Sequence, residues 1–297
     1  MALNVLSKRV TSRCAITFAV VTLTAGTMAA CTSTDSGGDS NHLQELKDKG
    51  VVTVGFAGEA PYSFEQDGNL TGATVALHRE IFGNLGIETV EGVNADFGSL
   101  IPGLQANRFD VVSAGMSILP QRCEQAAFGD PEFNYTTALM VTQGNPKGLK
   151  DMQSVKDSGA RLATMTGAVE SDYAESLGIE STQVATPQDG MDAVMSGRAD
   201  VFALTAISLN WMKTNNPGAP VDVTESFVAN IDGKPQVGAG ATVFRTDDKE
   251  LLEAYNAELA KITSDPQKYL DLVGEFGFTE EELPDPNLTT AQLCEGV

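Results

Sequence analysis

Histidine and cysteine are scarce in this sequence of 297 residues, and their scarcity excludes several kinds of active site. Only two histidines are present, His42 and His78, and neither stands at ligand spacing from a cysteine. This argues against a zinc site, so we expect no bound metal, and no motif requires a cofactor. We expect His42 in a flexible tether and His78 on a helix, which leaves no Ser/His/Asp or Cys/His arrangement for catalysis.

Basic residues are also few, since 19 Lys and Arg stand against 40 Asp and Glu. Binding to phosphate backbones or to anionic lipid surfaces needs clustered positive charge. The acidic balance therefore excludes nucleic acid as a partner and argues against an anionic membrane face. Its main physical effect is solubility.

One long apolar run is present, from Ala15 to Ala30, and the positive residues Lys8, Arg9 and Arg13 precede it. This order is typical of a secretory signal peptide, which we predict over residues 1–30. The run is too short for a stable membrane span, and no later run is long enough to cross a bilayer.

The end of this run suggests a lipid anchor. Ala29 and Ala30 are small and lead into Cys31, as in the signals of bacterial lipoproteins, where the cysteine carries the lipid. We therefore expect an extracytoplasmic protein held to the cell membrane through Cys31; the alternative is an ordinary secreted protein. Residues 32–41 lack large apolar side chains, so residues 31–42 are predicted to be a flexible tether.

The remaining cysteines form an even pair. Cys14 leaves with the signal peptide and Cys31 is expected to carry the lipid, so Cys123 and Cys294 remain. In an oxidising compartment such a pair favours a disulfide, which would join the C-terminal tail to the first part of the fold. The alternative is two unpaired buried thiols.

Predicted strands and helices alternate along the chain. Apolar periodicity and turn residues predict helices over 43–49, 75–85, 97–106, 170–177, 187–196, 248–263 and 266–273, and strands over 51–56, 88–93, 111–114, 161–164, around 184, 201–204 and 241–244. This order predicts an α/β fold with mostly parallel sheets covered on both faces. Residues 104–112 and 194–202 share one pattern: the end of a predicted helix, then Asn or Gly, then Arg-x-Asp, then a predicted strand. Two lobes of similar design would produce this repetition.

Several segments resemble a known family. Residues 101–110, 114–122 and 128–131 resemble the first lobe of the family-3 extracellular solute-binding proteins of ABC importers, and 197–201 and 255–260 resemble the second lobe and the returning helix. The resemblance implies two Rossmann-like lobes of the periplasmic-binding-protein type II, joined by hinge strands. The expected boundaries are 43–142 for the first part of lobe one, 143–238 for lobe two, and 239–297 for the return and tail.

Within this family the details are most similar to the ectoine and hydroxyectoine receptors. Residues 58–62, residues 97–104 and the Arg122-Cys123 pair with Leu293-Cys294 carry this likeness. It implies a monomer that captures a small zwitterion by lobe closure and delivers it to ABC permease subunits in the membrane.

Arg122 is the first candidate for ligand binding. A guanidinium matches a carboxylate in bidentate geometry, and the family implies that role at this position. The alternative is a surface arginine near a helix start, where the helix dipole disfavours a cation. Ser117 and the backbone of Gly115 lie in the turn after a strand, where ligands of such sheets bind. The ectoine subgroup implies a Phe at position 117, so Ser117 is a departure that favours an amino acid receptor.

Other candidates surround this point. Glu59 is expected to pair with a ligand cation, or to be a solvated loop acid. Tyr62 and Phe97 are expected to place ring faces over a delocalised cation, or to be ordinary packing. Gly167 and Val169 precede or begin a helix, where backbone N–H groups hold anions.

Thr205 stands where the family implies an Asp that pairs with an α-ammonium group. A buried unpaired ammonium is costly, so a plain α-amino acid fits only if Glu59 or Glu170 compensates. A delocalised cation such as the amidinium of ectoine fits better. The alternatives are a polar amino acid receptor of the same family, and a ligand-sensing module or dehydratase on the same fold. Without a placed acid–base pair, we do not expect an enzyme.

Overall fold

The structure is a computed structural model that describes residues 42–231, 234–235 and 238–296. The predicted signal peptide (1–30), the lipid site at Cys31 and the tether up to residue 41 lie outside the described residues. Over the described ranges, no helix has the length and apolarity needed to span a membrane.

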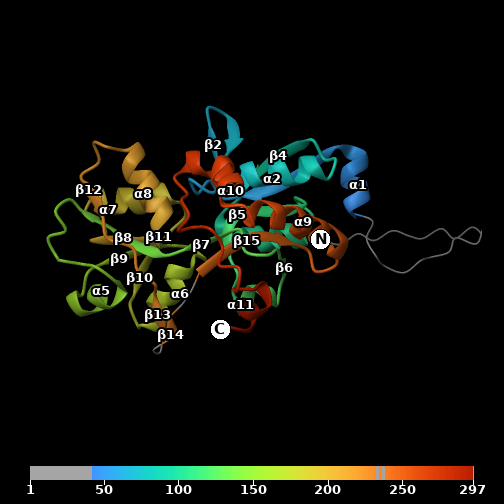
Figure 1. The fold of residues 1–297 in the computed structure, drawn as a ribbon. Helices are drawn as coiled ribbons and strands as arrows, with labels where there is room; N and C mark the ends of the chain where they lie inside the picture. Colours follow the sequence, from blue (N-terminus) through green and yellow to red (C-terminus); the bar gives the residue numbers. More distant parts are fainter. Residues whose placement is uncertain (1–41, 232–233, 236–237, 297) are drawn as a thin grey trace, which may run out of the picture. The chain divides into compact units, whose positions relative to one another are not determined.

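The first lobe is built on a sheet with the strand order β4-β1-β5-β15-β6, and β7 also pairs with β15 (Figure 1). The strands are β1 (Val51–Phe56), β4 (Thr89–Asn94), β5 (Val111–Ser117), β6 (Ala127–Phe128), β7 (Phe133–Tyr135) and β15 (Gly238–Phe244). β1 is parallel to β4 and β5, whereas β15 is antiparallel to β5, β6 and β7. The chain therefore returns from far along the sequence into the middle of this sheet.

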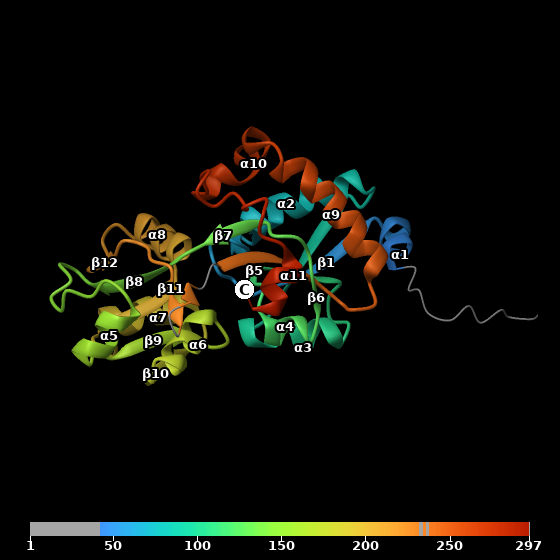
Figure 2. The ribbon, with the colours of Figure 1, turned by 60° about the horizontal axis from the view of Figure 1, so that its bottom comes forward.

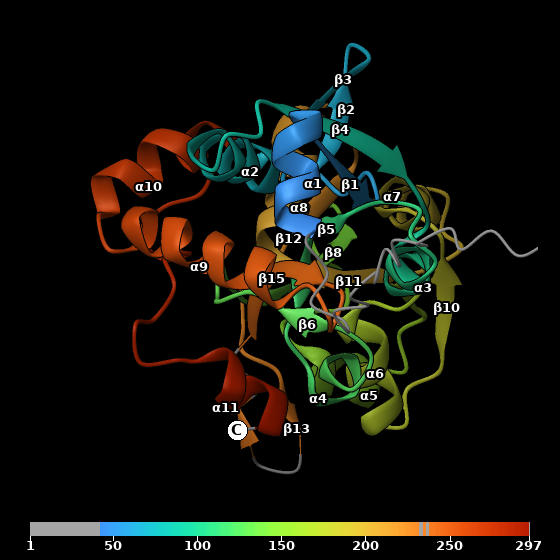
Figure 3. The ribbon, with the colours of Figure 1, turned by 90° about the vertical axis from the view of Figure 1, so that its right-hand side faces the viewer.

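Helices cover both faces of this sheet, as Figures 2 and 3 show. They are α1 (His42–Lys49), α2 (Ala73–Asn84), α3 (Leu100–Gln105), α4 (Pro120–Cys123), α9 (Lys249–Thr263), α10 (Pro266–Val273) and α11 (Thr290–Glu295). α2, α9 and α10 pack on one another on one face, and α3 packs on β1 and β5 on the other. Burial on both sides explains why β5 reads as a continuous apolar and small-residue run.

The second lobe has its own five-stranded sheet, with the order β10-β9-β11-β8-β12. Its strands are β8 (Thr137–Thr142), β9 (Leu162–Met165), β10 (Ser181–Val184), β11 (Val201–Thr205) and β12 (Val221–Val223). Its helices are α5 (Met152–Ser158), α6 (Val169–Ser176), α7 (Pro187–Met195) and α8 (Ala206–Asn215). The strand β9 is parallel to β10 and β11, and β8 runs antiparallel, which repeats the design of the first lobe.

The chain passes between the sheets earlier than the sequence suggested. β7 pairs in the first sheet and β8, which starts at Thr137, pairs in the second. The expected boundary at residue 142 is therefore too late, because β7 and β8 form one extended run in which no turn residue marks the change of sheet. The return to the first sheet begins with β15 at Gly238.

Several shorter elements were not predicted. The helix expected over 97–106 begins as a 3-10 turn, η1 (Phe97–Ser99), before α3. A hairpin of β2 (Phe64–Gln66) and β3 (Asn69–Thr71) projects from the first lobe, and β13 (Asn230–Ile231) pairs with β14 (Lys234–Pro235). A second 3-10 turn, η2 (Gly274–Phe276), follows α10.

His42 is not part of a tether. It is the first residue of α1, its side chain is buried, and its ring nitrogens lie 3.1 Å from the carboxylates of Asp110 and Asp248. Arg245 reaches the Asp248 carboxylate at 2.9 Å. This ionic cluster joins α1 to the start of β5 and to the start of α9. Burial alone would lower the pKa of His42, but the hydrogen bonds to Asp110 and Asp248 outweigh it and raise that pKa to about 9.

The raised pKa of His42 predicts a stability that depends on pH. The protonated ring stabilises the fold fully below its unfolded pKa of 6.5, and this contribution is lost as pH rises through about 9. The shift corresponds to at most about 3 kcal/mol. We expect His42→Gln to lower the free energy of unfolding most at pH 6 and least near pH 10, as measured by urea denaturation. A difference between the two proteins that does not change with pH would contradict this.

Candidate functional site

Most of the predicted ligand residues line one small cavity between the two lobes. The first lobe contributes Glu59, Tyr62, Phe97, Gly115 and Ser117, and the second contributes Met165, Ala168, Val169, Glu170, Leu204 and Thr205. Of the predicted set, only Arg122 and Gly167 are outside this lining. Met165 and Leu204 were not predicted, because strand residues of this kind carry no polar signal.

The strand order explains why these residues meet. Glu59 follows β1, Ser117 ends β5, Gly167 follows β9 and Thr205 ends β11. Ligands of open α/β sheets bind at these carboxyl ends of the strands. The two lobes therefore present equivalent edges to one another.

Gly115 has a backbone that requires glycine. Its φ is +57°, and a Cβ atom there would lie 2.5 Å from the ring of Tyr62. The missing side chain allows this buried ring to pack directly on β5 beside the cavity.

The cavity measures about 20 Å³, which is room for roughly one water molecule. A zwitterion of amino acid size needs more space, so groups that line the cavity have to move apart when it binds. A larger hollow of about 510 Å³ opens beside His42 and Arg245, but none of the predicted ligand residues lines it.

Glu59 joins the two lobes directly. Its side chain is 4% exposed, and its Oε1 accepts a hydrogen bond of 2.7 Å from the hydroxyl of Ser208. The hydroxyl of Thr205 lies 3.4 Å from the same oxygen. Ser208 stands in the first turn of α8 and was not predicted, because its contact depends on how the lobes face each other.

Glu170 is the second buried acid of the cavity. It is 1% exposed, lies in the first turn of α6, and accepts a hydrogen bond of 3.2 Å from Thr137. Burial raises the pKa of Glu59 and of Glu170 to about 7. Repulsion from Glu170 adds to the shift of Glu59, while Arg122 partly offsets that of Glu170. The cavity lining thus holds two acids and no cation.

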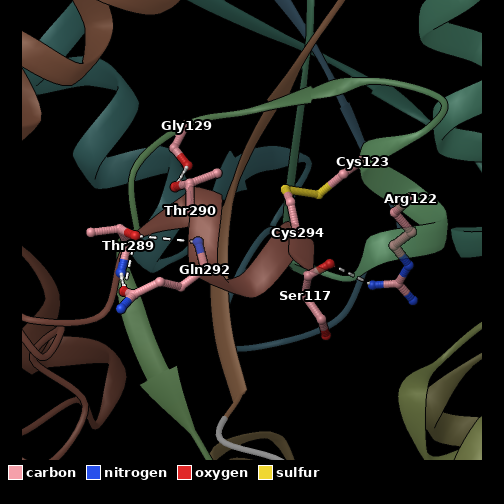
Figure 4. Close-up of a disulfide and its surroundings, with 8 residues drawn as sticks. All are labelled: Ser117, Arg122, Cys123, Gly129, Thr289, Thr290, Gln292 and Cys294. Carbon is pink, nitrogen blue, oxygen red and sulfur yellow. Dashed lines mark hydrogen bonds between the residues drawn. A yellow bond between two sulfur atoms is a disulfide. The ribbon is translucent and has the colours of Figure 1, made fainter. Parts of the chain in front are cut away.

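Arg122 lies beside the cavity and contacts both lobes, and Figure 4 shows its hydrogen bond to Ser117. Its guanidinium donates to the carbonyl of Ser117 at 3.0 Å and to the carbonyl of Gly167 at 2.7 Å. It also lies 5.5 Å from the ring centroid of Phe97. Gly167 was expected to offer a backbone N–H group to an anion, whereas here its carbonyl accepts from the guanidinium.

Trp211 forms a second contact between the lobes, outside the cavity. Its ring lies 5.8 Å from that of Phe64 and 6.4 Å from that of Phe276, both in the first lobe. Because it is the one tryptophan of the chain, its fluorescence should report the separation of the lobes.

Comparison with known proteins agrees with this architecture. Residues 52–270 match the model of the bacterial extracellular solute-binding proteins, family 3. The chain belongs to this family. The prediction of two α/β lobes of the periplasmic-binding-protein type is confirmed.

Individual relatives of this solute-binding protein cover most of its length. It is 33% identical to a probable amino-acid ABC transporter periplasmic-binding protein, y4tE, of Sinorhizobium fredii, over 85% of both chains. It is 25% identical to the arginine-binding extracellular protein ArtP of Bacillus subtilis, over 86% of this chain and 94% of the relative. The crystal structure of EhuB in complex with hydroxyectoine is similar with a TM-score of 0.77 and 30% identity, covering 87% of this chain and all of that one.

The two buried acids predict that lobe closure without a ligand depends on pH. In this arrangement burial raises the pKa of Glu59 and Glu170 from the ordinary 4.5 to about 7, so an opening that exposes them to water is opposed at low pH and favoured as pH rises through 7. We expect the ligand-free protein to be more closed at pH 5 than at pH 8, by X-ray scattering and Trp211 fluorescence.

The control is Glu59→Gln/Glu170→Gln, which should lose most of this pH dependence. Arg122, Asp172 and Tyr173 remain near Glu170 in both proteins, so they cancel in the comparison. An equal pH response in the wild type and the double variant would refute the assignment.

Proposed function

We propose that this solute-binding protein is the extracytoplasmic receptor of an ABC importer and binds a small zwitterion with a delocalised cation, of the ectoine type. The observation that carries the proposal is the meeting of a guanidinium and two buried acids between the lobes. Such a site offers complementary charges to both ends of a zwitterion, and each lobe supplies part of it.

The carboxylate of the ligand is assigned to Arg122. On binding, the guanidinium exchanges the Gly167 carbonyl for a charged acceptor, and hydrogen bonds between charged groups are the stronger ones. The hydroxyl of Ser117, at the end of β5, lines the cavity and can donate to the same carboxylate. The N-terminus of α6, which begins at Val169, favours an anion nearby.

The cationic end is assigned to Glu59, Glu170 and the rings of Tyr62 and Phe97. Thr205 hydrogen bonds to Glu59 and brings no charge of its own, so the cation meets two acids whose pKa values fall as it binds. A delocalised cation is weakly hydrated and stacks on ring faces, which suits this lining. The similarity to EhuB, whose structure contains hydroxyectoine, supports the ectoine type.

A second candidate is a basic amino acid. Two acids in one cavity exceed the need of a ligand with one positive group, and the acidic pair suits a ligand with an ammonium and a side-chain cation. The similarity to the arginine-binding protein ArtP favours this candidate, as does Ser117.

The proposed location is the outer face of the cell membrane, through a lipid on Cys31. The order of positive residues, apolar run, small pair and cysteine supports it. In this setting the monomer collects solute near permease subunits in the membrane. The relatives reported above are named as binding proteins or appear with a bound solute, which supports delivery as the role.

A ligand panel separates the two candidates. We expect ectoine or hydroxyectoine to raise the melting temperature of the purified protein, because a ligand at 100 times its Kd stabilises the native state by about 2.7 kcal/mol. L-Arginine, L-lysine, L-glutamine and glycine betaine complete the panel. If arginine or lysine stabilises the protein and ectoine does not, the ligand is a basic amino acid rather than one of the ectoine type. If no compound of the panel stabilises the protein, both candidates are rejected.

Arg122→Ala tests the carboxylate site. Removing one partner of a desolvated charge pair costs about 2–5 kcal/mol, so we expect ligand affinity to fall at least about 30-fold in calorimetry. The matched control is Arg198→Ala, at an exposed arginine of the second lobe, which should bind as the wild type does. Unchanged affinity of a folded Arg122→Ala protein would refute the site.

A further inference from the structure

Arg122 lies on a helix, α4, that is too short to be stable by itself. The helix α4 is one turn of four residues, from Pro120 to Cys123, and its N-cap residue Leu119 provides no side-chain cap. The backbone N–H groups of Arg122 and Cys123 both donate to the Leu119 carbonyl, at 3.0 and 2.9 Å. A single helical turn is unfavourable by itself, so the direction of Arg122 depends on what packs against α4.

The element that packs against α4 comes from the end of the chain. Helix α11 lies against α4, and the disulfide between Cys123 and Cys294 joins them, with Cα atoms 5.7 Å apart (Figure 4). Leu293, next to the bridge, is buried in the same apolar cluster as Phe97 and Ile118. Residues 277–289, which lead to α11, contain no helix or strand.

The disulfide is adjacent in sequence to Arg122, whose side chain extends from the opposite side of α4. Cys123 follows Arg122 directly, and the Arg122 guanidinium extends from α4 toward the carbonyls of Ser117 and Gly167. A shift of α4 would therefore displace the guanidinium. Binding groups have to be held to within about 0.5 Å to make their contacts, so a small shift is enough to weaken a bidentate bond.

We infer that Cys123 and Cys294 are positioning residues, because their disulfide fixes α4 against α11 and thereby directs Arg122 at the ligand carboxylate. The inference rests on the proposed function, which assigns the carboxylate to Arg122. It adds that ligand affinity depends on the C-terminal tail, although no residue of α11 lines the cavity.

A purely stabilising disulfide would behave differently. The bridge spans 171 residues of sequence, and closing so long a loop stabilises the folded state whatever lies beside it. That effect lowers the melting temperature when the bridge is removed but leaves the affinity of the folded protein unchanged. The stabilising role and the positioning role are therefore distinguished by the ligand affinity of the folded protein, and by whether the effect of the bridge on that affinity requires Arg122.

The test is a double-mutant cycle on the full chain. Four proteins are compared by calorimetry with the panel compound that binds the wild type: the wild type, Cys123→Ser/Cys294→Ser, Arg122→Lys, and the triple variant. Arg122→Lys retains the charge but not the bidentate fork, so weakened binding remains measurable. We expect loss of the bridge to weaken binding about 10-fold when Arg122 is present and less than about twofold in the Arg122→Lys protein.

Thr290→Val is the matched control. It removes the 2.7 Å hydrogen bond from the Thr290 hydroxyl to the Gly129 carbonyl, which also anchors α11, and leaves the bridge in place. We expect a lower melting temperature with unchanged affinity. If Thr290→Val weakens binding as much as loss of the bridge does, a general loosening of the tail explains the effect and the inference fails.

The remaining outcomes are distinct. If loss of the bridge weakens binding equally with and without the Arg122→Lys substitution, or in neither case, the positioning role is overturned and the proposed function stays in place. A wild type that binds no panel compound, or Arg122→Lys with wild-type affinity, overturns the proposed function and this inference with it. If the serine pair does not fold, the bridge is opened by mild reduction of folded wild type, confirmed by mass spectrometry, and the same affinities decide.

Discussion

The carboxyl groups of Glu59 and Glu170 are withdrawn from water in one cavity between the lobes, and the proposed ligand site depends on how their charge is balanced. Hydroxyl groups of Ser208 and Thr137 satisfy part of their hydrogen-bonding capacity. Hydroxyls do not neutralise charge, so burial still raises both pKa values to about 7. In the proposed site a ligand cation removes this penalty, so closure and cation binding favour each other.

The fold places the opposite charge where it can complete a zwitterion site. Arg122 comes from a short turn after β5 and reaches the second lobe through the Gly167 carbonyl. We infer that the tail fixes its position through the disulfide, while Glu59 follows β1 of the first lobe and Glu170 lies in the first turn of α6 in the second. In the proposed site the carboxylate and cation ends of a ligand thus meet elements that are anchored independently of one another.

The sequence predicted which residues lie together in the cavity where their position depends on local chain structure. Strand ends, helix starts and the segment around Arg122 were readable because periodicity and turn residues mark them, and the family resemblance assigned their roles. Contacts that depend on packing between the lobes were not readable. Ser208 looks like any polar helix residue, Trp211 like a core residue, and His42 like the end of a tether until Asp110 and Asp248 are placed beside it.

These interlobe contacts separate two properties of a closing receptor. Selectivity resides in the cavity, since only groups that touch the ligand distinguish one cation from another. The pairing of Glu59 with Ser208 and the packing of Trp211 on Phe64 and Phe276 involve protein groups alone and no ligand atom. Contacts outside the cavity stabilise the closed form equally for every ligand, so they set the overall level of affinity. In the proposed site the Glu59–Ser208 bond contributes to both, because the ligand cation is assigned to the same carboxylate that already links the lobes.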